Sequence, residues 1–221
     1  MSWESSAEYY RLINQETKRR LGGHHNARSL MLTVDFAEIE HLQHAGDWDA
    51  LGRMLGDAAR QLERGGADFV VLCTNTMHKL ADCITTAVRI PLLHIADAVG
   101  SAIQSAGCQR VALLGTRFTM EEPFYADRMR REFGIDNIIP DAKERQAIHD
   151  VIYNELCHGI IREESRAGFR GIIDRLRERG AEGVILGCTE IPLLISQADS
   201  TLPVFDSTAI HAAAAVERAA L

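Results

Sequence analysis

The 221-residue sequence lacks several features that mark common classes of protein. It has no run of 18 apolar residues, so we expect no membrane-spanning helix and no membrane partner. Its first five residues have neither the basic nor the apolar region of a signal peptide. No P-loop is present, and no GxGxxG pattern follows a predicted strand, so no nucleotide cofactor is indicated.

The cysteine content and the charge exclude further classes. The five cysteines are odd in number and widely spaced, and none forms a CxxC pair. A disulfide scaffold and a zinc site are therefore poorly supported, and we expect no bound metal. Reduced thiols are typical of a cytoplasmic protein, which is the localisation we expect. The net charge of −7 argues against a nucleic-acid partner.

Two stretches of the chain resemble each other. Residues 64–76 read RGGADFVVLCTNT, and residues 179–190 read RGAEGVILGCTE. Further along each copy, the PLLH of residues 91–94 aligns with the PVFD of residues 203–206. We therefore expect two copies of one helix–strand–turn unit. The residues that align at the strand ends are Thr74 with Cys188, Asn75 with Thr189, and Thr76 with Glu190.

Apolar strands alternate with amphipathic helices along the whole chain. This alternation predicts an α/β fold of two domains, each a parallel sheet flanked by helices. We expect a first domain of residues 1–97 plus 206–221 and a second of residues 98–205. The expected strands are 30–36, 69–73, 92–95, 110–115, 137–139, 183–186 and 203–205. The expected helices are 5–21, 47–64, 77–88, 98–107, 120–133, 144–179 with an interruption near Gly159, 189–197 and 207–221.

The repeat also indicates that the first domain lacks a strand. The second copy opens with strand 110–115 before its first helix, whereas the first copy opens directly at a turn, at Met1. Loss of a central parallel strand would expose hydrogen-bonding groups and apolar faces of its neighbours. We therefore expect roughly ten further residues before Met1 in the natural protein, forming an apolar strand that ends in glycine and fills a gap about one strand wide between strands 30–34 and 69–73.

Hydroxyl, thiol and carboxyl side chains lie at the strand ends of both copies. Ligands of parallel α/β sheets bind beyond the carboxyl ends of the strands, where Thr74 and Cys188 are placed. Helices that begin just after these strands would offer free N–H groups to a carboxylate. If the copies face each other, Thr74 and Cys188 flank one ligand. That arrangement suits two-base chemistry, in which one group removes a proton from carbon and the other returns one.

The same motifs resemble those of the aspartate/glutamate racemase family. The resemblance covers nearly the whole chain and includes CTNTMH at 73–78, GCTEI at 187–191, LLGT at 113–116, HIAD at 94–97 and MSWES at 1–5. It implies racemisation of an amino acid without pyridoxal phosphate or any other cofactor. It also implies two pseudo-symmetric domains with the active site between them, and usually a homodimer.

The resemblance implies that Thr74 and Cys188 transfer the protons. Most members have cysteine directly before Asn-Thr, where this chain has Thr74, as in the branch of L-aspartate/glutamate-specific and broad-specificity racemases. Cys73 is one residue earlier and points to the other strand face, so it should not substitute. A hydroxyl is far less acidic than a thiol, which leaves Cys188 as the credible acid or base. The substrate contacts implied by the resemblance and the repeat are Met1, Gln43, Asn75, Thr76, Thr116, Thr189 and Glu190.

Two other functions stay open at the level of sequence. The chain could be a related single-cysteine decarboxylase or isomerase of small carboxylic acids, because one thiol and one hydroxyl would fit that chemistry. It could also be a non-catalytic amino-acid-binding protein. His78 and His94 are expected to be structural rather than catalytic, and we expect the remaining cysteines, Cys83, Cys108 and Cys157, to serve packing.

Overall fold

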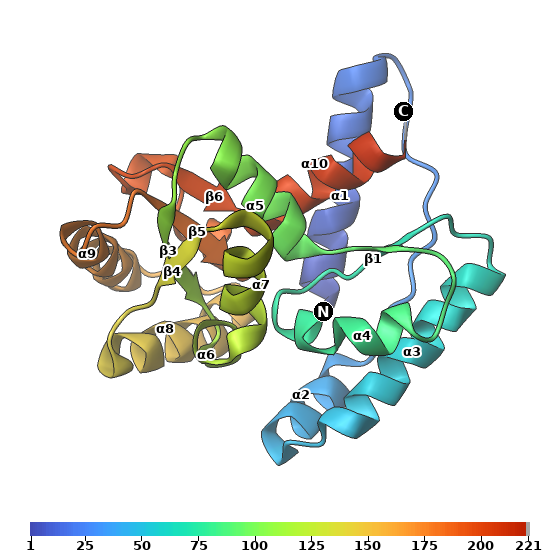
Figure 1. Ribbon diagram of the computed structural model, residues 1–221, viewed down its shortest axis with the longest axis horizontal. Coiled ribbons are helices and arrows are strands. Elements are labelled where there is room, and N and C mark those ends of the chain that lie inside the picture. Colours follow the sequence, from blue (N-terminus) through green and yellow to red (C-terminus); the bar gives the residue numbers. More distant parts are fainter. Residues whose placement is uncertain (220–221) are drawn as a thin grey trace. The chain divides into compact units, whose positions relative to one another are not determined.

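The structure is a computed structural model that describes residues 1–219. The chain divides into two compact units (Figure 1). The first unit comprises Met1–His94 together with the segment that begins at His211, and the second comprises Ile95–Ile210. Both contain a parallel sheet flanked by helices, which confirms the predicted α/β class. No helix within residues 1–219 is long and apolar enough to cross a membrane.

The second unit is built on four parallel strands. They are β3 (Arg110–Gly115), β4 (Asp136–Ile138), β5 (Gly183–Gly187) and β6 (Val204–Asp206), in the order β4-β3-β5-β6. The inner strands β3 and β5 are buried along almost their whole length, which explains their apolar sequences without alternation. β3 has a neighbour on each side.

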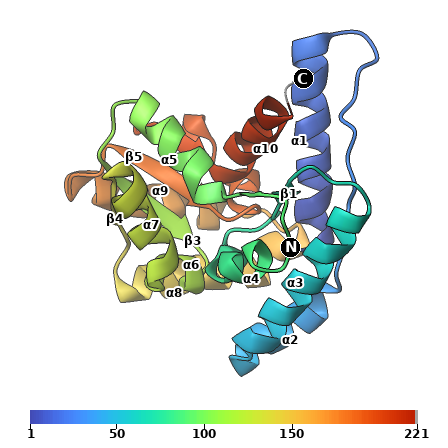
Figure 2. The ribbon, with the colours of Figure 1, turned by 45° about the vertical axis from the view of Figure 1, so that its right-hand side comes forward.

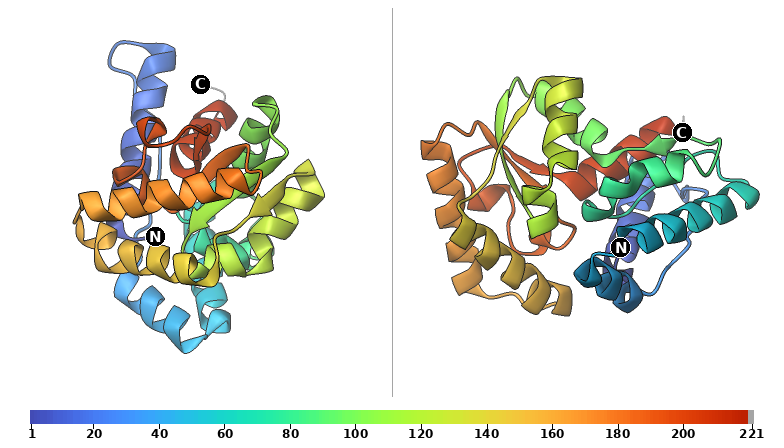
Figure 3. Two further views of the ribbon diagram at one scale, coloured as in Figure 1. Left: turned by 90° about the vertical axis from the view of Figure 1, so that its left-hand side faces the viewer. Right: turned by 60° about the horizontal axis from the view of Figure 1, so that its bottom comes forward.

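Helices cover both faces of this sheet. They are α5 (Ile95–Ser105), α6 (Arg117–Glu121), α7 (Pro123–Phe133), α8 (Ala142–Asn154) and α9 (Glu163–Glu178), with a short 3-10 turn η2 (Leu156–His158). α7 lies on one face of the sheet, and α8 lies with α9 on the other (Figure 3). The predicted helix 120–133 is split at Pro123, which begins α7 because it cannot continue α6. Gly134, with φ of 66°, ends α7 after Phe133, the predicted last residue of this helix.

The first unit has only two paired strands, β1 (Val70–Val71) and β2 (Leu92–Leu93). Its helices are α1 (Trp3–Leu21), α2 (Phe36–Ala45), α3 (Trp48–Arg64) and α4 (Ala81–Thr85), with η1 (Thr76–Leu80) as a 3-10 turn. α3 packs against α2 and α4 (Figure 2). The closing helix α10 (Ser207–Arg218) was predicted to reach residue 221, but residues 220–221 lie outside the described part.

The predicted strand at residues 30–36 is wrong. Residues 24–35 form neither helix nor strand, and Leu30 and Met31 are more than half exposed. A strand needs a hydrogen-bonded neighbour, and within residues 1–219 β1 pairs only with β2. The Asp35 side chain instead accepts a hydrogen bond from the Ala37 N–H and starts α2, a helix that the sequence analysis missed. The additional strand expected before Met1 lies outside this chain and stays a prediction.

The two copies of the repeat have the same local geometry. Val70 pairs with Leu92 in the first unit, and Val184 pairs with Val204 in the second. In both copies, the N–H of that valine donates to the carbonyl of the proline before the neighbouring strand, at 2.9 Å. The alignment of the two sequence motifs therefore identifies a genuine structural repeat.

Candidate active site

Thr116 and Cys188 leave neighbouring strands of the second unit at the same edge. Gly115 of β3 is in register with Gly187 of β5, so the residues that follow them lie side by side, with the strands about 5 Å apart. A Cβ on Gly115 would lie 2.8 Å from the Gly187 carbonyl oxygen, so glycine allows this approach. Thr116 begins α6, where its hydroxyl accepts a hydrogen bond from the Thr119 N–H.

Cys188 is paired with a carboxylate. Its thiol donates to Glu190 Oε2 at 2.9 Å, and the Thr189 hydroxyl donates to the same oxygen at 2.7 Å. Cys188 and Glu190 are only 7% and 8% exposed. Burial, followed by the charge of Glu190, raises the pKa of the Cys188 thiol well above its ordinary value. The resting thiol is therefore protonated, and the nearby carboxylate is placed to receive its proton.

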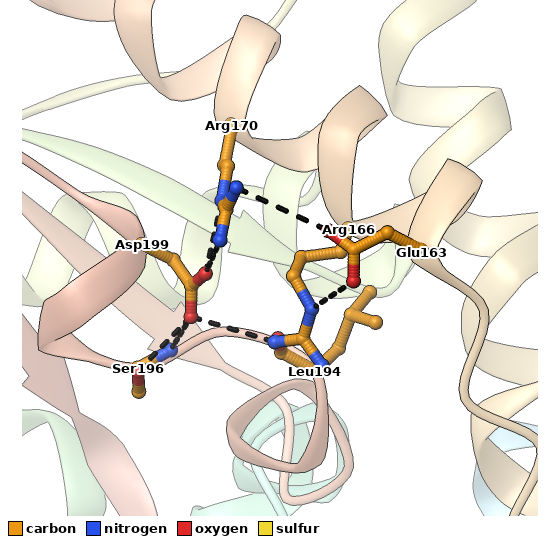
Figure 4. Close-up of polar contacts among 6 residues, drawn as sticks. All are labelled: Glu163, Arg166, Arg170, Leu194, Ser196 and Asp199. Carbon is orange, nitrogen blue, oxygen red and sulfur yellow. Dashed lines mark hydrogen bonds and ion pairs between the residues drawn. The ribbon is translucent and has the colours of Figure 1, made fainter.

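The loop after Cys188 is fastened to α9 by an arginine–aspartate network (Figure 4). Asp199 accepts hydrogen bonds from Arg170 and from the Ser196 N–H and hydroxyl, and its side chain is 5% exposed. Arg166 donates to the Leu194 carbonyl and forms an ion pair with Asp199 at 3.5 Å. These contacts fasten the segment from Leu194 to Asp199 to α9.

The helices predicted after the two motifs are much shorter than expected. In place of helix 189–197 there are two three-residue 3-10 turns, η3 (Ile191–Leu193) and η4 (Gln197–Asp199). In place of helix 77–88 there are η1 and α4, of five residues each. Pro192 and the β-branched residues after Cys83 disfavour longer helices. Such short turns have little macrodipole, so side chains must provide most of the recognition of a carboxylate.

Thr74, Asn75 and Thr76 follow β1 in the first unit and are all buried. The hydrogen bonds found for Thr74 involve its main chain: its N–H donates to Leu72, and its carbonyl accepts from His78. Its hydroxyl makes no hydrogen bond within residues 1–219.

Met1 and Cys73 lie beside this segment. The Met1 nitrogen donates to the Cys73 carbonyl at 2.7 Å. The Cys73 thiol lies 3.7 Å from the Val71 carbonyl of its own strand, and burial raises its pKa to about 11. Cys73 is thus a protonated thiol directed at its own main chain, as expected for a residue that serves packing.

Gln43 on α2 is the other predicted contact in the first unit. It is 5% exposed, and its Nε2 lies 3.1 Å from the sulfur of Met77. Its Oε1 is buried and has no hydrogen-bond partner among the residues that the structure describes. A buried carbonyl oxygen without a donor is costly, so a ligand with an N–H group could satisfy it.

The structure places the predicted residues in two groups. Thr116, Cys188, Thr189 and Glu190 gather in the second unit, and Met1, Gln43 and residues 74–76 belong to the first. Within residues 1–219, no three His, Cys, Asp or Glu side chains are grouped in a way that could hold a metal ion.

Sequence reasoning missed several polar residues near these groups. His149 accepts a hydrogen bond from the Arg117 N–H, next to Thr116. Tyr9 and His211 are hydrogen-bonded in the first unit although 202 positions separate them. No local pattern could have joined that pair, whereas the spacing of four between Thr74 and His78 was visible in the motif.

Comparison with known proteins gives a consistent result. The model of the Asp/Glu/hydantoin racemase family matches residues 1–215. A crystal structure from Yersinia pestis, described as a candidate Asp/Glu racemase, is 50% identical, covers 100% of this chain and 96% of its own, and superposes with a TM-score of 0.93. An aspartate racemase homologue from Pyrococcus horikoshii OT3 is 32% identical over 100% of this chain and 96% of its own, with a TM-score of 0.87.

A curated relative adds to this. The broad specificity amino-acid racemase RacX of Bacillus subtilis (strain 168) is 25% identical over 175 residues, which are 77% of this chain and 73% of that protein. The family match spans both units and both copies of the repeat. This chain therefore belongs to the Asp/Glu/hydantoin racemase family of amino-acid isomerases.

Proposed function

We propose that this protein racemises aspartate, glutamate or a broader set of amino acids, by proton transfer at Cα, without a cofactor. Thr74 and Cys188 act on opposite faces of Cα. The observation that carries the proposal is the pair of Cys188 and Glu190, which places a protonated thiol and a proton acceptor 2.9 Å apart after a buried strand. The family match over residues 1–215 supplies the reaction class.

The Cys188 side of the reaction works in both directions. In one direction the thiol gives its proton to the planar carbanion at Cα. In the other, Glu190 takes the thiol proton, and the thiolate then removes the proton from Cα. Because burial keeps the pKa of Cys188 high, Glu190 is needed to form the thiolate near neutral pH.

The Thr74 side is chemically weaker. A hydroxyl is a poor base, so Thr74 needs a partner or a water to carry its proton. The threonine at position 74 supports assignment of this chain to the branch of L-aspartate/glutamate-specific and broad-specificity racemases, which its motif resembles. We expect unequal rates for the two enantiomers and no change in the equilibrium between them.

The remaining residues bind the substrate. The Gln43 Oε1, which has no partner within residues 1–219, suits the substrate ammonium group, and the hydroxyl of Thr116 suits its carboxylate. Thr189 contacts that carboxylate when its hydroxyl turns from Glu190 to the substrate. Asn75, Thr76 and the Met1 main chain line the Thr74 side.

A homodimer and a reducing compartment are part of the proposal. All five cysteines are free thiols, and Cys188 can act only in that state, which favours the cytoplasm. Trp3 and Tyr10 are exposed one heptad apart on α1, which suits a self-association surface. Light scattering of the purified protein tests this point, and a monomer mass at micromolar concentration would contradict it.

The test of function is a panel of L- and D-amino acids incubated in deuterated water and analysed by chiral chromatography and mass spectrometry. We expect the opposite enantiomer to form, with deuterium at Cα, from aspartate, glutamate or several amino acids. Loss of a carboxyl group from a small carboxylic acid would instead identify a decarboxylase. Ligand binding with no exchange at Cα for any amino acid would identify a binding protein.

A further inference from the structure

Four buried side chains that can carry or share protons gather close to Thr74. They are at most 6% exposed and come from α1, η1, the end of β2 and α10 of the first unit: Tyr9, His78, His94 and His211. Burial of an imidazole or a phenol is costly unless its polar atoms are hydrogen-bonded. The hydrogen-bond partners of these four side chains therefore indicate which part of the main chain the cluster positions.

Main-chain carbonyls fix where two of the imidazoles carry their protons. His78 Nδ1 lies 2.7 Å from the carbonyl oxygen of Thr74, which can only accept, so Nδ1–H is the donor. His211 Nε2 lies 2.9 Å from the Leu93 carbonyl and donates to it in the same way. The other ring nitrogen of His211, Nδ1, is hydrogen-bonded to the Tyr9 hydroxyl at 2.8 Å.

Ring contacts join these hydrogen bonds into one unit. The centroid of the His78 ring is 4.5 Å from that of His94 and 5.9 Å from that of His211. His94 is the residue directly after β2, and Leu93 is its last residue. The cluster thus ties the carbonyl of Thr74 to the end of the neighbouring strand.

The repeat shows that the fold does not require a histidine at this place. Met77 aligns with Ile191, and both are completely buried, so the apolar anchor is common to the two copies. His78 aligns with Pro192, which has no donor to offer to the carbonyl of Cys188. The hydrogen-bonding side chain is therefore present only on the side where the proton-transfer group is a hydroxyl.

We propose that His78, held by His94 and by the Tyr9–His211 pair, is the positioning residue for Thr74. Its Nδ1–H fixes the main chain of Thr74 and so directs the hydroxyl at one face of Cα. This rests on the proposed function, because it concerns the Thr74 half of the same reaction. A misplacement of about 1 Å in such a group costs roughly 100-fold in rate, enough to account for a dedicated hydrogen bond.

Three substitutions of His78 separate positioning from packing. Asparagine can place an N–H near the Nδ1 position, whereas glutamine places it one bond further out and leucine has none. We expect His78→Asn to racemise within a few-fold of wild type, and His78→Gln and His78→Leu to lose roughly 100-fold. His41→Asn, on an exposed position of α2, is the matched control and should behave as wild type.

Hydrogen exchange at Cα in deuterated water can be lost for one enantiomer alone, whereas loss of structure would lower it for both. His78→Gln and His78→Leu should still exchange the Cα hydrogen of one enantiomer, the one that faces Cys188, while inversion is lost. Tyr9→Phe removes only the hydroxyl bonded to His211 and should give a weaker loss of the same one-sided kind. Thermal unfolding shows which variants are folded.

Three results would overturn the proposal. The first is wild-type racemisation by folded His78→Leu. The second is an equal loss of Cα exchange for both enantiomers in folded His78→Gln and Tyr9→Phe. The third is a His78→Asn protein that is as impaired as His78→Gln. Absence of racemisation in the wild-type protein would instead refute the proposed function.

Discussion

Cys188 and Cys73 show how surroundings decide the chemistry of a residue. Each follows a strand of the same repeat, and burial raises the pKa of each thiol. Only Cys188 has a carboxylate within hydrogen-bonding distance, whereas Cys73 faces a carbonyl of its own strand. A carbonyl cannot accept a proton under these conditions, so only Cys188 can alternate between thiol and thiolate.

Cys188→Ser should therefore abolish racemisation and leave the fold intact, because a hydroxyl of similar size cannot supply a comparable anion. The expected loss in kcat is roughly 100- to 10,000-fold, the contribution of a positioned proton-transfer group. Cys73→Ser is the matched control and should stay within a few-fold of wild type. Comparable losses in the two variants would show that the strand register was misassigned.

Glu190→Gln tests the partner of the thiol. The amide keeps the size of the side chain but cannot accept the thiol proton, so removal of a proton from Cα by Cys188 should fall roughly 100-fold. Exchange of the Cα hydrogen with deuterated water, measured separately for each enantiomer, should fall for one enantiomer more than for the other. An unchanged exchange rate for both would mean that Cys188 is deprotonated without Glu190.

At the scale of elements, close approach of β3 and β5 sets the positions of Thr116 and Cys188. A Cβ on Gly187 would lie 3.0 Å from the Leu114 carbonyl oxygen and from a Leu113 methyl group. Gly187→Ala should cost about 1–3 kcal/mol of unfolding free energy through overpacking, and lower activity as well. Gly168→Ala on α9, where the added carbon would have no atom within 4 Å apart from its chain neighbours and the helix's own backbone, should keep or raise stability. Equal stability of the two variants in urea titrations would refute this packing argument.

The network that fastens the loop after Glu190 should contribute to the pH dependence of the free energy of unfolding in acid (the acid limb). Arg170, followed by Ser196, lowers the pKa of Asp199 to about 2 from an ordinary value of 3.8. Because the unfolded chain binds the proton more readily, this contribution is complete above about pH 5 and is lost as pH falls from about 4 to about 2. Asp199→Asn should be less stable at pH 7 and show a shallower acid limb in urea titrations. Coinciding acid limbs for the two proteins would contradict this role.

Sequence patterns foretold the elements of the second unit better than those of the first. Strand 110–115 and the strand beginning at Gly183 were found because each is a continuous apolar run that pairs on both sides. The apolar run at 30–36 looks similar in sequence, but no strand pairs with it within residues 1–219, and pairing is a tertiary property. Asp35, which starts α2, was assigned to the predicted strand, so the start of that helix was missed although an N-cap aspartate is a local signal.

At the scale of the whole molecule, the internal repeat and the family motifs supplied the candidate residues. The alignment placed Thr74 and Cys188 at equivalent positions, and matching strand registers confirm that equivalence. The contacts of Cys188 with Glu190, and of His78 with Thr74, could not be foretold because hydrogen-bond geometry depends on side-chain directions that a sequence does not specify. The Tyr9–His211 pair joins the two ends of the chain and had no signal at all.

The central claim is that two different groups transfer protons on opposite faces of Cα. The most direct measurement is the deuterium content at Cα of the product and of the recovered substrate. It is taken early in the reaction, in deuterated water, of an amino acid that carries ordinary hydrogen at Cα. Two bases predict a product enantiomer that carries deuterium and a recovered substrate that largely keeps its hydrogen, because the proton removed and the proton returned reside on different groups. A product enantiomer that retains the hydrogen of the substrate would show a single base and would contradict the account.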